Sequence, residues 1–187
     1  MHKSGPRRLA NASTGCSYEW IEVRVGAPER NVLNTQGNLA ITYEALGQKE
    51  RALPMRRDVY FGYVKILGKQ DYDSIREATN YADTLLNLER FKEARSLTRK
   101  MMPVARRVLG ENDAITLNMR WSYARALYED TSAALADLRE AVTTLEDTTR
   151  IARRVFGGAH PTTEELADEL RDARAALAAR ETPSRSK

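Results

Sequence analysis

Residues 68–110 have the sequence GKQDYDSIREATNYADTLLNLERFKEARSLTRKMMPVARRVLG, and the pattern of this stretch sets the architecture of the chain. Capping side chains at 71–74 favour a helix start. Apolar residues then recur at helical spacing over 75–86, and the polar break at 87–90 is long enough only for a tight turn. A second periodic run covers 91–108. The stretch therefore predicts two helices joined by a short turn.

The same pattern recurs along the chain with a step of 42 residues. Gly26, Gly68 and Gly110 are each 42 residues apart, and Gly157 follows after 47, so one unit carries five extra residues. At Gly110, which ends its helix, a left-handed C-terminal cap is expected. A fixed period of this size is typical of stacked helix pairs, which bury their apolar faces against their neighbours.

We predict an all-α fold: a right-handed α-solenoid of about three helix–turn–helix repeats with a C-terminal capping helix. The solenoid is expected over 18–180, between a disordered N-terminus at 1–17 and a polar tail at 181–187. Its units follow from the glycines, with repeats at about 26–67, 68–109 and 110–156 and the cap at 157–180. The five extra residues fall between Tyr128 and Glu140, where they lengthen the turn or the second helix.

Alanine recurs at two positions of the unit and predicts close packing of the two helices. In the first helix of each pair the equivalent residues are Ala40, Ala82 and Ala124. In the second helix they are Ala52, Ala94 and, once the insertion is allowed for, Ala141. The small side chain lets the helices approach, while larger apolar residues fill the space beside it.

The two ends differ from the repeats. The last helix is expected at about 162–180 and has one apolar stripe, formed by Leu166, Leu170, Ala173 and Leu177. Its opposite face, which we interpret as solvated, carries Glu165, Asp168, Glu169 and Asp172. A one-sided helix of this kind suits a solenoid cap. Near the other end, Tyr18 to Val25 alternates with a strand-like period, which leaves two interpretations: a degenerate helical cap or the scar of a truncation.

The composition indicates an ordered, helix-rich chain of 187 residues with a formal net charge of +4. Cys16 is the only cysteine, so no internal disulfide forms, which suits a reducing compartment. No apolar run reaches the roughly 18 residues that a membrane span needs, and the basic N-terminus lacks the apolar core of a secretory signal. We therefore expect a cytoplasmic protein without a membrane partner.

The sequence offers almost no material for the site of an enzyme. His2 and His160 are the only histidines, Cys16 has no neighbouring base, and neither a phosphate loop nor a metal-ligand spacing occurs. We therefore expect no catalytic residue, no cofactor and no metal, and we expect His160 to shape a loop. The pattern also disfavours nucleic-acid binding, because the arginines are spread along the chain rather than gathered on one face.

Several sequence motifs recur in phase with the period. They are Asn38-Leu39-Ala40, Ala52-Leu53-Pro54-Met55, Lys92-Glu93-Ala94, Arg106-Arg107-Val108-Leu109-Gly110, and Arg153-Arg154-Val155-Phe156-Gly157 before His160-Pro161. Together they resemble the tetratricopeptide repeat (TPR), in the 42-residue form of kinesin light chains, over about 26–179. Pro54 matches the family pattern, whereas Pro103 departs from it and is expected to kink its helix.

The resemblance implies an inner groove, lined by the first helix of each repeat, that takes an extended or partly helical peptide. Mapping those helices by spacing places ten residues there: Asn34, Asn38, Ile41, Arg76, Asn80, Asp83, Asn118, Trp121, Ser122 and Arg125. Asn38 and Asn80 occupy the groove asparagine of the family, whose amide donates to and accepts from a peptide backbone. Arg76 and Arg125 are expected to pair with a ligand carboxylate, and Trp121 to act as an aromatic anchor.

Other interpretations of these residues remain open. An asparagine on a helix is often simply solvated, and Trp121 also suits core packing. Arg76 with Asp83, and Arg125 with Glu129, also suit surface ion pairs that contribute little. The lysine–asparagine–arginine set of chaperone-type carboxylate clamps is incomplete, which disfavours an acidic C-terminus as the ligand.

The combined prediction is a protein-interaction scaffold that binds a peptide segment of a partner protein in the inner groove. The alternative is a structural fragment or self-associating module of a longer solenoid, which pairs through Tyr18–Val25 or through the last helix. Weak nucleic-acid binding through the arginines is a distant third, and it predicts an affinity that falls steeply with salt.

Overall fold

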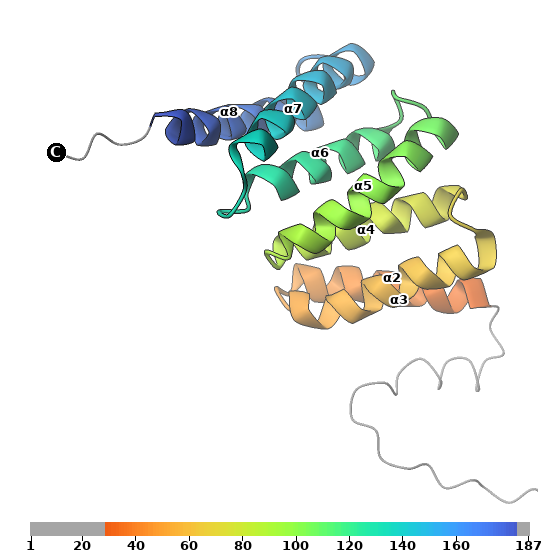
Figure 1. The fold of residues 1–187 in the computed structure, drawn as a ribbon. Helices are drawn as coiled ribbons and strands as arrows, with labels where there is room; N and C mark the ends of the chain where they lie inside the picture. Colours follow the sequence, from red (N-terminus) through yellow and green to blue (C-terminus); the bar gives the residue numbers. More distant parts are fainter. Residues whose placement is uncertain (1–28, 183–187) are drawn as a thin grey trace, which may run out of the picture.

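The structure, a computed structural model, describes residues 29–182 (Figure 1). This part of the chain contains seven α-helices and no strand: α2 (Glu29–Ala45), α3 (Lys49–Leu67), α4 (Tyr72–Asn87), α5 (Phe91–Val108), α6 (Ala114–Tyr128), α7 (Leu135–Phe156) and α8 (Pro161–Glu181). The predicted all-α solenoid is confirmed. The expectations for 1–17 and for Tyr18–Val25, and most of the tail, lie outside the described residues.

The helices pair in sequence order, and the pairs stack one on the next (Figure 1). Each second helix packs on the first helix of its own pair and on the first helix of the following pair. The first helices α4, α6 and α8 also contact one another in turn, whereas α3, α5 and α7 make no such contacts among the described helices. The backbones of the first helices α2 and α4 do not approach each other this closely. We call the side on which the first helices lie the inner side of the stack, because it is the concave side in stacked helix pairs.

The six repeated alanines lie where paired helices touch, and each has no exposed surface. This result confirms the close packing that the sequence predicts. Larger side chains beside them complete the core, among them Leu85 and Leu127, which are each 1 % exposed. The core is thus divided into clusters between successive helices rather than gathered at one centre. Pro103 lies inside α5, and the helix continues beyond it to Val108.

Repeated side-chain caps fix where three of the first helices begin. Asp71, Asp113 and His160 stand at equivalent positions before α4, α6 and α8. The side chain of each accepts a hydrogen bond from the backbone N–H two residues later, at 2.9, 2.8 and 3.2 Å respectively. The His160 ring also stacks on Phe156, with 4.9 Å between the ring centroids. His160 therefore shapes the loop before α8, as the sequence suggests.

A glycine with positive φ follows each second helix, and two of these glycines have a ψ outside the left-handed helical region. Gly110 has a positive φ of 92°, as glycine at a helix end should. The equivalent Gly68 and Gly157 combine φ values of 85° and 94° with ψ values of 164° and 162°. A left-handed helical cap would have ψ near 47°. These two residues instead occupy a region of backbone space that is nearly restricted to glycine.

The five extra residues of the third repeat are shared between its turn and its second helix. The link between α4 and α5 spans 88–90, whereas the link between α6 and α7 spans 129–134. Phe91, which begins α5, corresponds to Leu138, but α7 already begins at Leu135. The longer turn is held by Arg180 of α8, whose guanidinium donates to the backbone carbonyls of residues 131 and 133 at 2.6 and 3.3 Å.

Candidate functional site

The ten residues mapped to the inner side line two consecutive cavities there. A cavity of about 380 Å³ between α2 and α4 is lined in part by Asn34, Asn38, Ile41, Arg76 and Asn80. A second, of about 290 Å³ between α4 and α6, is lined by Asp83, Asn118, Trp121, Ser122 and Arg125 together with Asn87. Nine of the ten occupy three equivalent positions of the repeat, and Trp121 is the tenth. We call the two cavities together the inner groove.

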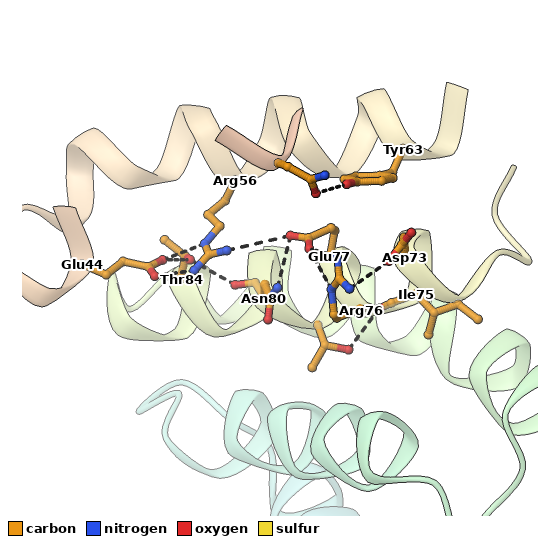
Figure 2. Close-up of polar contacts among 11 residues, drawn as sticks. Glu44, Arg56, Tyr63, Asp73, Ile75, Arg76, Glu77, Asn80 and Thr84 are labelled. Carbon is orange, nitrogen blue, oxygen red and sulfur yellow. Dashed lines mark hydrogen bonds and ion pairs between the residues drawn. The ribbon is translucent and has the colours of Figure 1, made fainter. Parts of the chain in front are cut away.

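A buried arginine joins the first two repeats beside the first cavity (Figure 2). Arg56 extends from α3 between α2 and α4, and its residue is only 6 % exposed. Its guanidinium donates to both carboxylate oxygens of Glu44, at 2.6 and 3.1 Å, and lies 3.8 Å from Glu77. Thr84 donates to Glu44 at 2.6 Å, and Asn80 donates to Glu77 at 3.1 Å. The buried charges are therefore paired and hydrogen-bonded, as burial requires.

The electrostatics of Glu44 keep this network ionised. Burial by itself raises the pKa of the Glu44 carboxyl, but the hydrogen bonds from Arg56 and Thr84 outweigh it and hold that pKa below its usual value. The sequence pattern does not reveal this network, because Arg56 looks like half of a surface Arg-Arg pair. Its partners are supplied by α2 and α4, one on either side of α3 in the chain.

The asparagine amides of the inner groove differ in how far they are already engaged. Asn34 accepts a hydrogen bond from the Tyr63 hydroxyl at 2.5 Å, which leaves its NH₂ group available. Asn80 uses its NH₂ group on Glu77, which leaves its carbonyl oxygen available. Asn38 and Asn118 accept hydrogen bonds only through their backbone carbonyls, from Thr42 and Ser122, so within residues 29–182 their side-chain amides have no partner. Donors and acceptors thus recur along α2, α4 and α6.

Both groove arginines are already paired with carboxylates of this chain. Arg76 lies 2.8 Å from Asp73 and 3.0 Å from Glu77. The alternative pairing of Arg76 with Asp83 is therefore wrong. Arg125 donates to Glu129 at 2.8 Å, which is the alternative ion pair considered for it, and lies 3.8 Å from Glu169.

Asp83 connects the second and third repeats. The Ser122 hydroxyl donates to one Asp83 oxygen at 2.5 Å. Burial raises the pKa of Asp83 to about 6, although the Ser122 hydrogen bond and the charge of Arg125 both oppose the rise. The second cavity therefore contains a carboxylate that titrates just below neutral pH.

Trp121 combines the two roles that the sequence leaves open. Its ring is partly buried and packs against the core cluster shared by α6, α7 and α8. It also lines the second cavity. Its indole N–H is buried and has no acceptor among the described residues.

The acidic face of α8 continues the same positions of the repeat. Residues 47 positions after Asn118, Trp121, Ser122 and Arg125 are, in order, Glu165, Asp168, Glu169 and Asp172. Glu169 accepts a hydrogen bond from the Tyr128 hydroxyl, and burial raises the pKa of Glu169. When only the three repeats are compared and α8 is left out, the acidic residues of α8 are interpreted as a solvated face. The inner side therefore becomes acidic toward α8.

Within residues 29–182, no group of three or more histidine, cysteine, aspartate or glutamate side chains is placed to hold a metal ion. No helix in that range is long and apolar enough to cross a membrane.

Comparisons with known proteins agree with this architecture. The family model of the tetratricopeptide repeat matches residues 78–115. Comparison with curated protein sequences gives no match. The chain therefore contains a recognisable TPR unit in its central part, from within α4 to the start of α6.

Solved structures share the fold over most of both chains. One is a single-residue variant of a kinesin light chain-like protein from Podosopora anserina with nearly identical TPR-like repeats. It is 22% identical to this chain and has a TM-score of 0.69, and the match covers 87% of this chain and 74% of that one. Another structure of these repeats has 20% identity and a TM-score of 0.61, covering 89% and 84%. BtubC (BKLC) from P. vanneervenii has 15% identity and a TM-score of 0.55, covering 91% and 76%. The fold is thus that of kinesin light chain-like TPR repeats.

Proposed function

We propose that this TPR-type solenoid is a protein-interaction scaffold that binds a peptide segment of a partner protein in the inner groove. TPR folds generally mediate protein–protein interaction, and curved stacks of helix pairs offer extended concave binding surfaces. The observation that carries the proposal is the arrangement of ten residues, nine of them at equivalent positions of the repeat, along two consecutive cavities on one side.

The amides supply the main contact with the peptide backbone. Asn38 and Asn118 each offer a donor and an acceptor, while Asn34 offers a donor and Asn80 an acceptor. Hydrogen bonds to a backbone do not depend on the peptide's side chains, so they give affinity with little sequence preference. Ile41, which is 53 % exposed, adds an apolar contact at the α2 end.

Charge gives the peptide its direction. Arg76 and Arg125 are neutralised by neighbouring carboxylates, whereas Asp83 has no ion pair within 4 Å among the described residues. The inner face of α8 adds further carboxylates. The peptide therefore places its basic side chains toward α8, where opposite charge favours both encounter and orientation.

To test this proposal, the full chain is used as the bait to select binding peptides from a displayed library of random peptides. Asn38→Ala with Asn118→Ala should weaken their binding about tenfold or more, because two backbone-anchoring amides are lost. Gln70→Ala with Ser96→Ala is the matched control, since both residues are polar side chains outside the inner groove. Circular dichroism verifies that each variant folds.

The selected peptides should be enriched in lysine and arginine near one end. Selection that yields no binder, or binders that treat the asparagine variant and the control alike, would remove the inner groove as the binding site.

A further inference from the structure

A third cavity lies between α7 and α8 and has a different chemistry. Its volume is about 700 Å³, larger than either cavity of the inner groove. Five arginines and one glutamate line it around an apolar floor that includes Leu170. The arginines are Arg150, Arg153 and Arg154 of α7 and Arg171 and Arg174 of α8. We call this cavity the arginine groove.

Comparison of α8 with α6, the first helix of the preceding repeat, shows where the arginine groove lies in the repeat architecture. In the preceding unit, Leu117, Ala124 and Leu127 of α6 belong to the core cluster that α7 completes. The residues 47 positions later in α8 are Glu164, Arg171 and Arg174. The face of α8 that corresponds to the α7-binding face of α6 thus forms a wall of the arginine groove.

The charged residues at these positions of α8 change which kind of helix can pack against it. At this position α2, α4 and α6 have Ala40, Ala82 and Ala124, which have no exposed surface, and Ala124 packs in the core cluster that α7 completes. Arg171 and Arg174 at the corresponding sites of α8 are exposed side chains. A second helix of the repeat type, with an apolar face, cannot pack there as α7 packs on α6. The groove keeps room for a helix but has charged walls.

The positive charge of the arginine groove is only partly balanced. Three of its arginines pair with carboxylates at 2.6 or 2.7 Å, namely Arg150 with Asp147, Arg171 with Asp168, and Arg174 with Glu146. All three pairs are solvent-exposed, so they contribute little and exchange readily. Arg154 donates to the amide of Asn112, and Arg153 has no carboxylate within 4 Å in residues 29–182.

We infer that the arginine groove is a docking site for an amphipathic helix of a partner protein that carries acidic side chains. Its correspondence to the place that α7 occupies on α6 favours a helix, and its apolar floor favours an amphipathic one. Guanidinium groups recognise carboxylates through paired hydrogen bonds, which supplies specificity for glutamate and aspartate. A nucleic acid fits less well, because its charged backbone has no apolar face to place against Ala167 and Leu170.

A designed helical peptide binding to the full chain tests this assignment. The peptide copies the 22 residues of α7, keeps the apolar positions that would rest on the floor at Leu170, and carries glutamate at the positions that would meet Arg171 and Arg174. The same peptide with glutamine at those positions is the control ligand. Fluorescence anisotropy at physiological salt should give a dissociation constant about tenfold lower for the glutamate peptide.

Charge reversal locates the site. Arg153→Glu with Arg171→Glu should weaken the glutamate peptide about tenfold or more. Arg57→Glu with Arg107→Glu changes the net charge equally on exposed residues of α3 and α5 and should alter binding no more than about twofold.

Four results would overturn the assignment. They are equal affinity for the glutamate and glutamine peptides, equal loss in both charge-reversal variants, no binding of the glutamate peptide, and its displacement by a tighter-binding single-stranded RNA oligonucleotide. Sedimentation showing self-association that Arg153→Glu with Arg171→Glu abolishes would assign the groove to a second copy instead. Each result is independent of the inner groove, whose asparagines lie on other helices.

Discussion

Asp83 is a side chain that joins two repeats and also responds to pH. Its carboxylate accepts a hydrogen bond from Ser122 of the next first helix, and burial raises its pKa to about 6. An aspartate in an unfolded chain titrates near pH 3.9. Between about pH 4 and 6 the folded protein therefore binds a proton at Asp83 that the unfolded chain has largely released.

The first prediction concerns the pH dependence of stability. Because the folded state binds the extra proton, the contribution of Asp83 is most favourable at low pH and is lost as pH rises through about 6, by about 2–3 kcal/mol. Asp83→Asn keeps the shape and a hydrogen-bond acceptor but does not titrate. Denaturant unfolding between pH 4 and 7 should show a flatter profile for this variant than for wild type.

Asp58→Asn, an exposed aspartate of α3, is the control and should follow the wild-type profile. Parallel profiles for Asp83→Asn and wild type would mean that Ser122 and solvent keep this carboxylate near its ordinary pKa.

At the scale of the helices, local chemistry sets the ends and distant chemistry sets the contacts. Asp71 and Asp113 bond the backbone two residues away, so the helix starts could be predicted from the sequence. Arg56 takes its partners from 12 and 21 residues away on two other helices, and no local pattern identifies them. The period could place a residue on the inner side but could not predict which neighbour it would bond.

The equivalent positions 38, 80 and 122 illustrate this limit. Asn38 is unengaged among the described residues, Asn80 binds Glu77, and Ser122 binds Asp83. The location of all three follows from one spacing. Their hydrogen-bond partners depend on which side chains of the same helix or of the next first helix lie within reach, and these side chains are up to about one repeat length away in the sequence.

The second prediction concerns the end of α7. Gly157 has φ 94° and ψ 162°, and a Cβ added there would meet no atom within 4 Å. Gly157→Ala should therefore destabilise the protein by about 1–3 kcal/mol through backbone strain rather than through a clash. Gly158→Ala is a close control, because that Cβ is equally unobstructed and φ is not positive.

Urea unfolding of the two alanine variants gives the comparison. Gly158→Ala should lie within about 0.5 kcal/mol of wild type or slightly above it. Similar losses of unfolding free energy in both variants would show that alanine destabilises the α7–α8 turn for a reason other than the backbone conformation of Gly157.

Across the whole molecule, the contacts follow the order of the chain. No described helix contacts another that is more than two helices away along the sequence. Stability in such a stack is approximately a sum of terms between neighbours. The chemistry of the two sides is also ordered, because at the α8 end carboxylates face the inner groove while arginines line the groove on the other side.

The last prediction tests this neighbour coupling from both ends. Leu166 of α8 has no exposed surface, and Leu33 of α2 is 7 % exposed and packs against α3. Leu166→Ala and Leu33→Ala should each cost about 2–5 kcal/mol through lost burial and the cavity left behind. Because the stack transmits contacts only between neighbours, amide hydrogen exchange should accelerate chiefly in α7 and α8 for Leu166→Ala, and chiefly in α2 and α3 for Leu33→Ala. A uniform acceleration along the chain in both variants would instead mean that the solenoid opens as a single cooperative unit, in which case a ligand held in the inner groove would stabilise α8 as much as the helices it touches.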